Sequence, residues 1–391
     1  MTPHGDRLTI ALDKLTNAPH RDGCSMEIGI IGLPKSGKTT IFNALTQGQA
    51  ETSAYASSVD KVNIGVVKVP DPRLDGLQGI FKPKKRVPAE VQYVDIPLAP
   101  KGLGRGEGIG GEFLHHLQSA DALLHVVRDF IDEAIPHIEG SVDPQRDTAT
   151  MIMELAFADL AILERRLQRL KNSLKGAKSH EREALLKEQA LMERIKEALE
   201  GDIPLREQSF SDDEAKAIEN YQFLTAKPLL LVLNIGEERL GETVSLEAKL
   251  ESCQSRPQTG GMILCGKLEM ELAQLDEADA QEFRSSMELD EAGLKRMIRL
   301  SYELLGLVSF FTVVSEEVKA WTVRKGSNAL SAAGKIHSDM ERGFIRAEVV
   351  SYDDLIKCGS LAEARKQGLL RLEGKGYTVQ DGDIITFLFN V

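Results

Sequence analysis

The chain has 391 residues, with 48 lysines and arginines against 60 aspartates and glutamates, and therefore a formal net charge of −12. This length suggests two or three domains, and the acidic balance argues against general binding of nucleic acid, so no DNA partner is expected. The longest apolar stretches are too short to span a bilayer, so no membrane partner is expected. Four scattered cysteines without a C-x-x-C pair indicate reduced thiols in a cytoplasmic protein.

A phosphate-binding motif opens the folded part of the chain. The apolar stretch 28–31 predicts a buried strand, and Gly32 to Thr39 then match G-x-x-x-x-G-K-[ST] as G-L-P-K-S-G-K-T. A helix-like segment begins at Thr40. Strand, glycine turn and helix N-terminus in this order predict a P-loop. In such a loop Lys38 supplies a cation for the β- and γ-phosphates, and the Thr39 hydroxyl can bind Mg²⁺.

Two further strands are expected before a glycine-rich loop. Residues 64–69 and 91–94 are apolar, and the second stretch runs directly into Asp95. In P-loop nucleotidases a carboxylate at such a strand end holds the metal, directly or through water, and we assign Asp95 this role. A turn aspartate is the alternative. The stretch 101–111 holds six glycines and predicts a loop that rearranges with the γ-phosphate.

The same glycine-rich loop offers a rival interpretation as a dinucleotide site. It matches G-x-G-x-x-G at Gly106, Gly108 and Gly111. Asp129 lies near the end of the next strand, as a dinucleotide site requires. The fingerprint glycines should follow a strand immediately, whereas about ten residues separate them from Asp95. The P-loop interpretation is therefore favoured over a dehydrogenase that binds NAD.

A helical hairpin is expected after a strand at 122–127, in which His125 is interpreted as a core histidine. Between 148 and 200 the chain is rich in Leu, Ala, Glu, Lys and Arg, with apolar residues at alternating spacings of four and three. The pattern is interrupted and then resumes, which predicts two antiparallel helices joined at Gly176. We interpret the hairpin as a projecting interaction arm, with a structural brace as the alternative. Basic stretches at 82–86 and 165–175 are candidate nucleic-acid contacts, although such stretches are usually solvated surface.

Base recognition is expected near the end of a later strand. The apolar stretch 228–233 leads into Asn234-Ile235-Gly236-Glu237, at the place where a GTPase carries N-K-x-D. The aspartate of that motif accepts hydrogen bonds from guanine, and adenine offers no such donor pair. In this chain Ile235 replaces the lysine and the longer Glu237 replaces the aspartate, which weakens the case for GTP. The next expected strand, 262–265, leads into Gly266 and Lys267, where a loop would contact the base.

The last part of the chain, about 85 residues, predicts a small α+β unit of ubiquitin-like type. Helical character is expected over 329–341, and Asp381-Gly382-Asp383 predicts a turn. The strands are expected at 308–314, 320–323, 345–349, 377–379 and 384–389.

With these residues the chain resembles the YchF/Obg-like ATPases, a translation-factor-related branch of the P-loop GTPases. The matching stretches are Gly29–Pro34, Val69–Leu74, Gly106–Gly110, His125–Arg128, Asn234–Glu237, Phe310–Thr312, Ala320–Val323, Arg342–Val349 and Val379–Asp383. The resemblance implies an α/β P-loop G domain with a coiled-coil insertion and a C-terminal TGS domain. The expected boundaries are an N-terminal extension (1–25), the G domain in two parts (26–147 and 206–305), the insertion (148–205) and the TGS domain (306–391).

The resemblance also implies slow hydrolysis of ATP in preference to GTP, with Mg²⁺, by a protein that associates with ribosomes; a monomer is expected. The residues implied in nucleotide binding are Gly32, Pro34, Lys35, Ser36, Gly37, Lys38, Thr39, Thr40, Asn234, Glu237, Gly266 and Lys267. Thr39 and Asp95 would hold the metal. Like the family, this chain lacks the water-orienting glutamine after D-x-x-G and has Ala99 there. The catalytic candidates are Lys38, for phosphate charge, and His137, for the attacking water, with a plain surface histidine as the alternative.

Three departures from the family pattern affect these expectations. Leu98, preceded by Pro97, replaces the D-x-x-G glycine. The switch I threonine is opposite Ser57, Ser58 or Val59, and the family's Asn-Val in the P-loop becomes Lys35-Ser36. Two alternatives to a slow ATPase therefore stay open: a nucleotide-dependent binding module without hydrolysis, and a GTP-specific GTPase.

Overall fold

The computed structural model describes residues 26–48, 62–96, 111–254, 256–287, 292–314 and 316–390. The chain forms two compact units. The larger unit comprises Glu27–Val66 and Gln92–Leu304, and the smaller unit brings Val67–Val91 together with Leu305–Val391. The following predicted features lie outside the described residues: the N-terminal extension, Ser57 to Val59, Pro97 to Ala99, Gly106 and Gly108.

A six-stranded sheet forms the centre of the larger unit, in the order β2-β4-β1-β5-β6-β7. Neighbours from β4 to β7 in this order pair in parallel. The inner strands are almost wholly buried, as uninterrupted apolar stretches in a covered parallel sheet should be. The strands are β1 (Glu27–Ile31), β2 (Asn63–Lys68), β4 (Glu90–Asp95), β5 (Ala122–Asp129), β6 (Leu229–Ile235) and β7 (Thr259–Leu264). The predicted strands of this unit are confirmed.

Helices alternate with these strands, which gives the predicted α/β architecture. Because the paired strands run parallel, their carboxyl ends meet at one edge of the sheet, where open α/β folds bind ligands. The carboxyl ends of β1, β4, β5, β6 and β7 therefore share this edge. The helices are α2 (Lys38–Thr46), α4 (Gly111–Ser119), α7 (Asp212–Glu219), α8 (Thr243–Gln254), α9 (Gly266–Leu272), α10 (Glu277–Ser286) and α11 (Gly293–Leu304), with 3₁₀ turns at Leu205–Glu207, Leu224–Ala226 and Glu237–Glu242.

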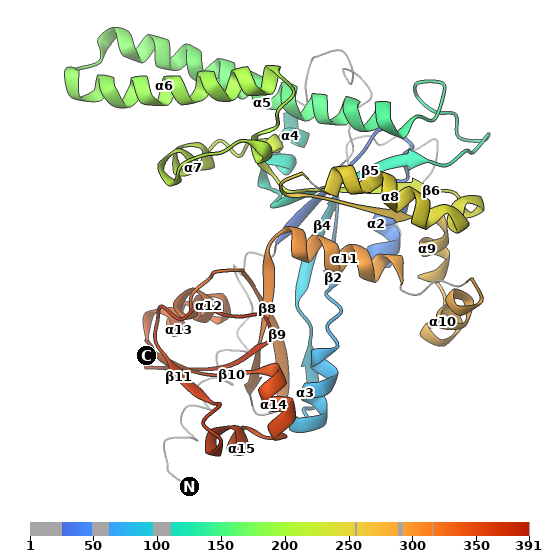
Figure 1. Ribbon diagram of the computed structural model, residues 1–391, viewed down its shortest axis with the longest axis vertical. Coiled ribbons are helices and arrows are strands. Elements are labelled where there is room, and N and C mark those ends of the chain that lie inside the picture. The colour runs from blue at the N-terminus through green and yellow to red at the C-terminus, as the bar shows by residue number, and fades with distance from the viewer. Residues whose placement is uncertain are drawn as a thin grey trace. The chain divides into compact units, whose positions relative to one another are not determined.

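The predicted hairpin is formed by α5 (Pro144–Gly176) and α6 (Ser179–Glu200), which lie side by side in Figure 1. Its own apolar core includes Leu163, Leu167 and Ile195. The first half of α5 packs elsewhere, because Met151 and Leu155 belong to the core beside β1. One continuous helix therefore joins the core of the sheet to the arm. Among the described residues, no helix is long and apolar enough to cross a bilayer.

A second six-stranded sheet forms the smaller unit, in the order β11-β10-β12-β8-β9-β3. The core beneath it includes Phe310, Ala333, Met340 and Phe387. The strands are β3 (Lys85–Val87), β8 (Leu307–Val314), β9 (Glu317–Arg324), β10 (Phe344–Ser351), β11 (Arg371–Glu373) and β12 (Asp383–Phe389). The helices are α3 (Arg73–Phe81), α12 (Ala329–Ile336), α13 (Ser338–Arg342), α14 (Tyr352–Cys358) and α15 (Leu361–Lys366).

Two local predictions for this unit were wrong. Residues 377–379 are not a strand, because Thr378 makes only an isolated bridge with Asn328 and the Val379 N–H bonds to the Ser327 carbonyl at 2.9 Å. The helix expected over 329–341 is two helices. The break falls at His337, whose extended backbone (φ −162°, ψ 142°) ends α12, and whose side chain accepts the Asp339 N–H that caps α13.

Residues 67–91 belong with the C-terminal strands, although the boundaries expected from the resemblance place them in the G domain. β3 pairs in parallel with β9 and lies at the edge of the second sheet. Arg73 at the start of α3 binds Asp71 at 2.8 Å and Asp381 at 2.7 Å. The smaller unit is therefore built from two distant parts of the chain. The other predicted boundaries stay predictions.

Candidate functional site

The P-loop lies between β1 and α2 and has the tight turn that its glycines predict. A Cβ added to Gly32 would lie 2.4 Å from the Val126 carbonyl oxygen, and one on Gly37 would lie 2.2 Å from Asn234 Nδ2. Only glycine fits at either position. The Ser36 N–H donates to the Leu33 carbonyl at 3.1 Å and closes the turn.

The start of α2 leaves backbone donors for an anion. Gly37 is the N-cap, and the first intrahelical bond runs from the Ile41 N–H to the Gly37 carbonyl, at 3.0 Å. The N–H groups of Lys38, Thr39 and Thr40 precede that bond and have no acceptor within the helix. This arrangement suits phosphate oxygens, which a helix N-terminus attracts through its free donors and its dipole.

Lys38, Thr39 and Asp95 meet at this helix N-terminus. Lys38 Nζ lies 3.1 Å from Asp95 Oδ1, and the Thr39 hydroxyl donates to Asp95 Oδ2 at 2.7 Å. Asp95 is 2% exposed, so its carboxylate depends on these partners. A hydroxyl and a carboxylate oxygen side by side are the ligand types that Mg²⁺ takes together with phosphates and water, so these residues fit the metal. Among the described residues, no group of three His, Cys, Asp or Glu side chains offers a separate metal site.

Asn234 joins two loops of the site. Its Nδ2 donates to the Ser36 carbonyl and its Oδ1 accepts from the Gly266 N–H, both at 2.9 Å. The side chain is 4% exposed. Both ends of the amide are therefore used to hold the P-loop against the start of α9. Asn234 acts on the nucleotide site by positioning these loops.

Glu237 and Lys267 lie at the exposed rim beyond Asn234. Lys267 Nζ is 3.0 Å from Glu237 Oε1, and their side chains are 69% and 45% exposed. The hydrogen bond to Glu237 raises the pKa of Lys267. The predicted base-site residues are thus brought together, with one carboxylate and one ammonium free to turn toward a base.

The side chain of His137 is almost inaccessible to solvent and is bound at both ring nitrogens. Nε2 lies 2.8 Å from Asp147 Oδ2, and each of these side chains is 3% exposed. The Glu139 N–H donates to Nδ1 at 3.1 Å, so Nδ1 is an acceptor and the ring proton is on Nε2. The His137 side chain is therefore less exposed than that of a plain surface histidine, and its role in hydrolysis stays a prediction. The ring would have to leave Asp147 before Nε2 could orient water.

Asp147 is the residue of this site that the sequence interpretation missed. It is in the first turn of α5, is 2% exposed, and also accepts from Arg146 at 2.8 Å. Asp143 followed by Pro144 is a helix-start signal that could have placed a carboxylate here. Its pairing with His137 depends on how the loop after β5 folds back onto α5.

His125 is a core residue, as predicted. It is 1% exposed in the middle of β5, and burial lowers its pKa to about 3. It lines a narrow hollow together with Ser36, His137 and Asp147. Within the described parts of the chain, neither His125 Nδ1 nor the Ser36 hydroxyl has a hydrogen-bond partner. His125 is thus a neutral group beneath the P-loop, away from reacting atoms.

Lys35 stands on the outer side of the P-loop. Its side chain is exposed, its backbone is left-handed (φ 69°), and its Nζ donates to the Pro136 carbonyl at 3.4 Å. The family resemblance implied that Lys35 is among the phosphate ligands. The structure adds that it contacts the loop after β5, which also carries His137.

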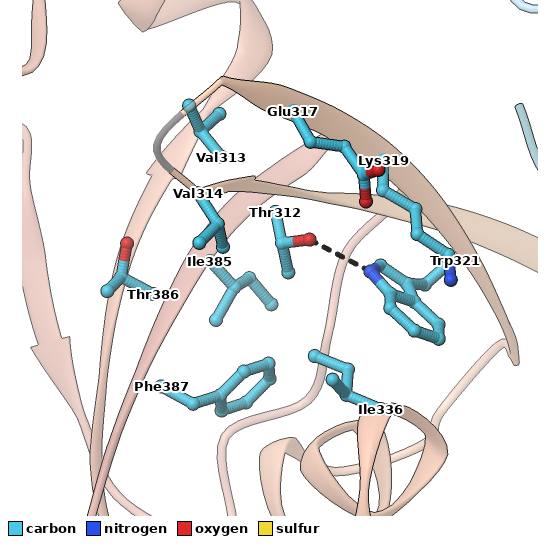
Figure 2. Close-up of a pocket in the computed structure, with 10 residues that line it drawn as sticks. All are labelled: Thr312, Val313, Val314, Glu317, Lys319, Trp321, Ile336, Ile385, Thr386 and Phe387. Atoms are coloured by element: carbon cyan, nitrogen blue, oxygen red, sulfur yellow. Dashed lines mark hydrogen bonds between the residues drawn. The ribbon is translucent and has the colours of Figure 1, made fainter. Parts of the chain in front are cut away.

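A separate hollow in the smaller unit does not resemble a nucleotide site. Figure 2 shows apolar side chains, among them Ile336 and Phe387, around the indole of Trp321. The indole N–H already donates to the Thr312 hydroxyl at 2.9 Å, and Lys319 Nζ lies 3.8 Å from the ring centre. The P-loop edge of the larger unit is therefore the candidate site.

Two family models match this chain. Residues 27–162 match the 50S ribosome-binding GTPase family, and residues 307–390 match the YchF-GTPase C-terminal family, which is described as a protein of unknown function. The α/β fold with a P-loop domain is therefore confirmed.

Curated relatives match over nearly the whole chain. The ribosome-binding ATPase YchF of Bacillus subtilis is 42% identical over 369 residues, which are 94% of this chain and 100% of the relative. The protein of that name from Escherichia coli O157:H7 is 39% identical and covers 93% of this chain and 99% of the relative. The solved YchF GTPase of Schizosaccharomyces pombe has a TM-score of 0.81 at 32% identity, over 94% of this chain and 99% of that one.

Proposed function

This chain belongs to the YchF family, and on that premise we propose that it binds ATP with Mg²⁺, hydrolyses it slowly and uses the nucleotide to control its association with the ribosome. The observation that carries the proposal is the meeting of Lys38, Thr39 and Asp95 at the start of α2. Association with ribosomes would place the protein in the cytoplasm.

Phosphate and metal binding follow from the contacts of Asp95. Bound Mg²⁺ would neutralise charge on the β- and γ-phosphates. Thr39 and Asp95 would hold it through the two oxygens that are now 2.7 Å apart. Lys38 would then exchange its 3.1 Å contact with Asp95 for the phosphates. The N–H groups at the start of α2 complete the phosphate site.

A preference for ATP is supported by the base-site residues. Asn234 holds the P-loop and the start of α9 through both ends of its amide, so its main contacts are with the protein. Glu237, which stands where GTPases read guanine through an aspartate, is paired with Lys267. Several relatives are also named ATPases. We therefore propose that Glu237 and Lys267 contact adenine, and that neither selects guanine.

Low turnover without a partner is supported by the state of His137. A water-orienting group needs a free nitrogen near the γ-phosphate, but both ring nitrogens are bound to Asp147 and Glu139. Hydrolysis through His137 would require the loop after β5 to release the ring. A ribosome that moved this loop would accelerate hydrolysis.

Ribosome association is supported by the names of the relatives and by the charge of the arm. Exposed cations gather along the far half of α5 and the turn that follows it: Arg165, Arg169, Lys171, Lys175 and Lys178. None of them forms an ion pair with another described residue. Free cations on a projecting helix suit the phosphate backbone of RNA. We propose that the C-terminal unit is a TGS domain, and we assign it no contact with the ribosome.

Calorimetric titration with Mg·ATP and Mg·GTP tests the nucleotide. We expect ATP to bind more tightly, and GTP that bound tenfold more tightly than ATP would overturn the adenine assignment. The same titrations with EDTA in place of Mg²⁺ should show weaker ATP binding.

Single-turnover release of phosphate, measured with and without ribosomes, tests hydrolysis. We expect slow release from the protein alone and faster release with ribosomes. No release under either condition would instead support a nucleotide-dependent binding module, the alternative that Leu98 and the altered switch I position left open.

A further inference from the structure

We propose that Lys35 is a second catalytic cation of the P-loop, whose ammonium moves onto the triphosphate and stabilises the charge that develops during hydrolysis. This inference rests on the proposed function as an ATPase. It assigns to the chain itself a positive charge that many P-loop proteins obtain from a partner.

The first observation is backbone strain at Lys35. Its φ of 69° is in the left-handed region, which costs a residue with a Cβ about 1 kcal/mol or more. Glycine would adopt this turn without that cost. Strained residues of this kind gather at functional sites, where the side chain justifies the conformation. Lys35 therefore keeps a charged side chain on the P-loop turn, although glycine would fit that turn at lower cost.

The second observation is the position of the ammonium. Lys35 is in the loop after β1, and its Nζ lies 3.4 Å from the carbonyl of Pro136, in the loop after β5. β1 and β5 are parallel neighbours, so both loops leave the same edge of the sheet. That edge is where a P-loop binds its nucleotide. The ammonium therefore lies within the rim of the proposed triphosphate site.

The third observation is that Lys35 is free to move. Its side chain is exposed, and among the described residues no carboxylate lies within ion-pair distance of it. Lys38 differs, because its side chain is 15% exposed and it is paired with Asp95. A 3.4 Å bond to a neutral carbonyl is weak, and a phosphate oxygen is a far stronger acceptor for an ammonium. Binding of ATP should therefore draw Lys35 from Pro136.

The chemistry of hydrolysis defines what this cation does. The oxygen of a water attacks the γ-phosphorus, and the bond from that phosphorus to the β–γ bridging oxygen breaks. The electron pair stays on ADP, and the proton of the water passes to inorganic phosphate or solvent. Negative charge thus builds on the bridging and γ-oxygens. Lys35 would donate to these oxygens from the outer rim, while Lys38 donates from the start of α2.

The test compares Lys35→Asn with the wild type in the full-length protein. Asparagine tolerates left-handed backbone, so this variant keeps the turn and removes the charge. We expect single-turnover hydrolysis of ATP to slow by about 10- to 100-fold, as for loss of one transition-state donor. The Kd for ADP should change less than threefold. Lys35→Arg, which restores the cation, should recover most of the rate.

Lys82→Asn is the matched control. Lys82 is also an exposed lysine with left-handed backbone (φ 46°), at the end of α3 in the smaller unit. Its replacement removes the same charge from the same type of backbone and should leave the rate unchanged. Lys35→Gly, which fits the turn best, gives a second charge-free variant if Lys35→Asn does not fold.

Three outcomes would overturn the inference. If Lys35→Asn hydrolyses ATP at the wild-type rate, the role of Lys35 is overturned, while the proposed function as an ATPase stands. Lys35→Arg that is as slow as Lys35→Asn would show that charge is not the reason. Wild type that releases no phosphate, with or without ribosomes, would overturn the proposed function and this inference with it.

Discussion

Asp95 is the residue whose contacts set the charge balance of the P-loop. It is almost fully buried, and its two oxygens are bound to the Lys38 ammonium and the Thr39 hydroxyl. If a metal ion displaced Lys38, the carboxylate of Asp95 would still be paired with a cation. The same carboxylate thus holds the P-loop in shape, and in the proposed function it would also be a metal ligand.

Replacement of Asp95 by asparagine should weaken binding of ATP in the presence of Mg²⁺ at least tenfold, about 1.4 kcal/mol. The carboxamide keeps a similar shape but loses the charge that holds the metal. Titration of ATP with Mg²⁺ and with EDTA measures this, and the two affinities should nearly coincide in the variant.

Asp75→Asn is the control for this experiment, because Asp75 is an exposed aspartate of α3 that pairs with Arg86. If ATP binding depends on Mg²⁺ as strongly in Asp95→Asn as in the wild type, Asp95 is not a metal ligand.

His125 gives a pH prediction at the same scale. Burial lowers its folded-state pKa to about 3, while an unfolded histidine titrates near pH 6.5. The unfolded state therefore binds the proton first as pH falls below about 6.5, and the free energy of unfolding drops by up to about 1.4 kcal/mol per pH unit. His125→Leu should lose this dependence between pH 6.5 and pH 5.

Denaturant unfolding at these two pH values measures the effect, as the difference between wild type and variant. His180→Leu is the control, because its side chain is 76% exposed and should leave the pH dependence as it is. Equal pH dependence in wild type and His125→Leu would show that burial does not lower the pKa of His125 in the folded protein.

Helix α5 is the element that links the candidate nucleotide site to the arm. Its N-cap Asp143 accepts from the N–H groups of Gln145 and Arg146, and its first turn holds Asp147 against His137. Its 33 residues extend about 50 Å at 1.5 Å per residue. A movement of the His137 loop would therefore act on a helix that ends among the cations of the arm.

Reversal of charge on the arm should weaken ribosome binding without affecting hydrolysis by the free protein. For Lys171→Glu on α5 we expect a loss of several-fold in affinity, about 1 kcal/mol, since an exposed cation near RNA phosphates becomes an anion. Co-sedimentation with ribosomes at two salt concentrations measures it.

The variant should also show a weaker salt dependence than the wild type. Lys216→Glu on α7 carries the same charge change on an exposed lysine outside the two helices of the hairpin. Equal losses in both variants would indicate a general charge effect in place of an RNA contact by the arm.

At the scale of the whole molecule, the smaller unit depends on a segment inserted between β2 and β4. Arg73 from that segment binds Asp71 and Asp381, and Asp381 also accepts the Ser309 N–H at 2.8 Å. The guanidinium of Arg73 lies 5.2 Å from the ring centre of Phe311. These contacts fasten residues 67–91 to strands more than two hundred residues later in the chain.

Arg73→Ala should lower the free energy of unfolding of this unit by about 2 kcal/mol. Asp71, whose side chain is 8% exposed, would be left without its cation, while the more exposed Asp381 would lose less. Trp321 is the single tryptophan of the chain and lies in this unit, so its fluorescence during denaturation reports on the unit.

Arg86→Ala is the control, because Arg86 and Asp75 form an exposed ion pair, with side chains 45% and 73% exposed. Its loss should cost less than about 1 kcal/mol. Equal costs for the two variants would contradict a fastening role for Arg73.

Local sequence patterns predicted the elements that make their own contacts or follow a periodic rule. The P-loop could be predicted because its glycines, Lys38 and Thr39 lie within eight residues and their spacing fixes the turn. The strands of the first sheet are apolar stretches, and the hairpin follows from its heptad spacing. By contrast, β3 and β11 have three residues each, too few for a periodic signal, and exist because distant strands pair with them.

The sequence by itself therefore determined that this protein has a P-loop, an α/β sheet, a helical arm and a C-terminal α+β unit. Only the tertiary structure decided what the scattered residues do. Asn234 binds Ser36 across 198 positions, and His137 is held by a carboxylate on α5. The physical reason is that such contacts depend on which strand ends share an edge and which side chains lose water there, and neither is written in the spacing of neighbouring residues.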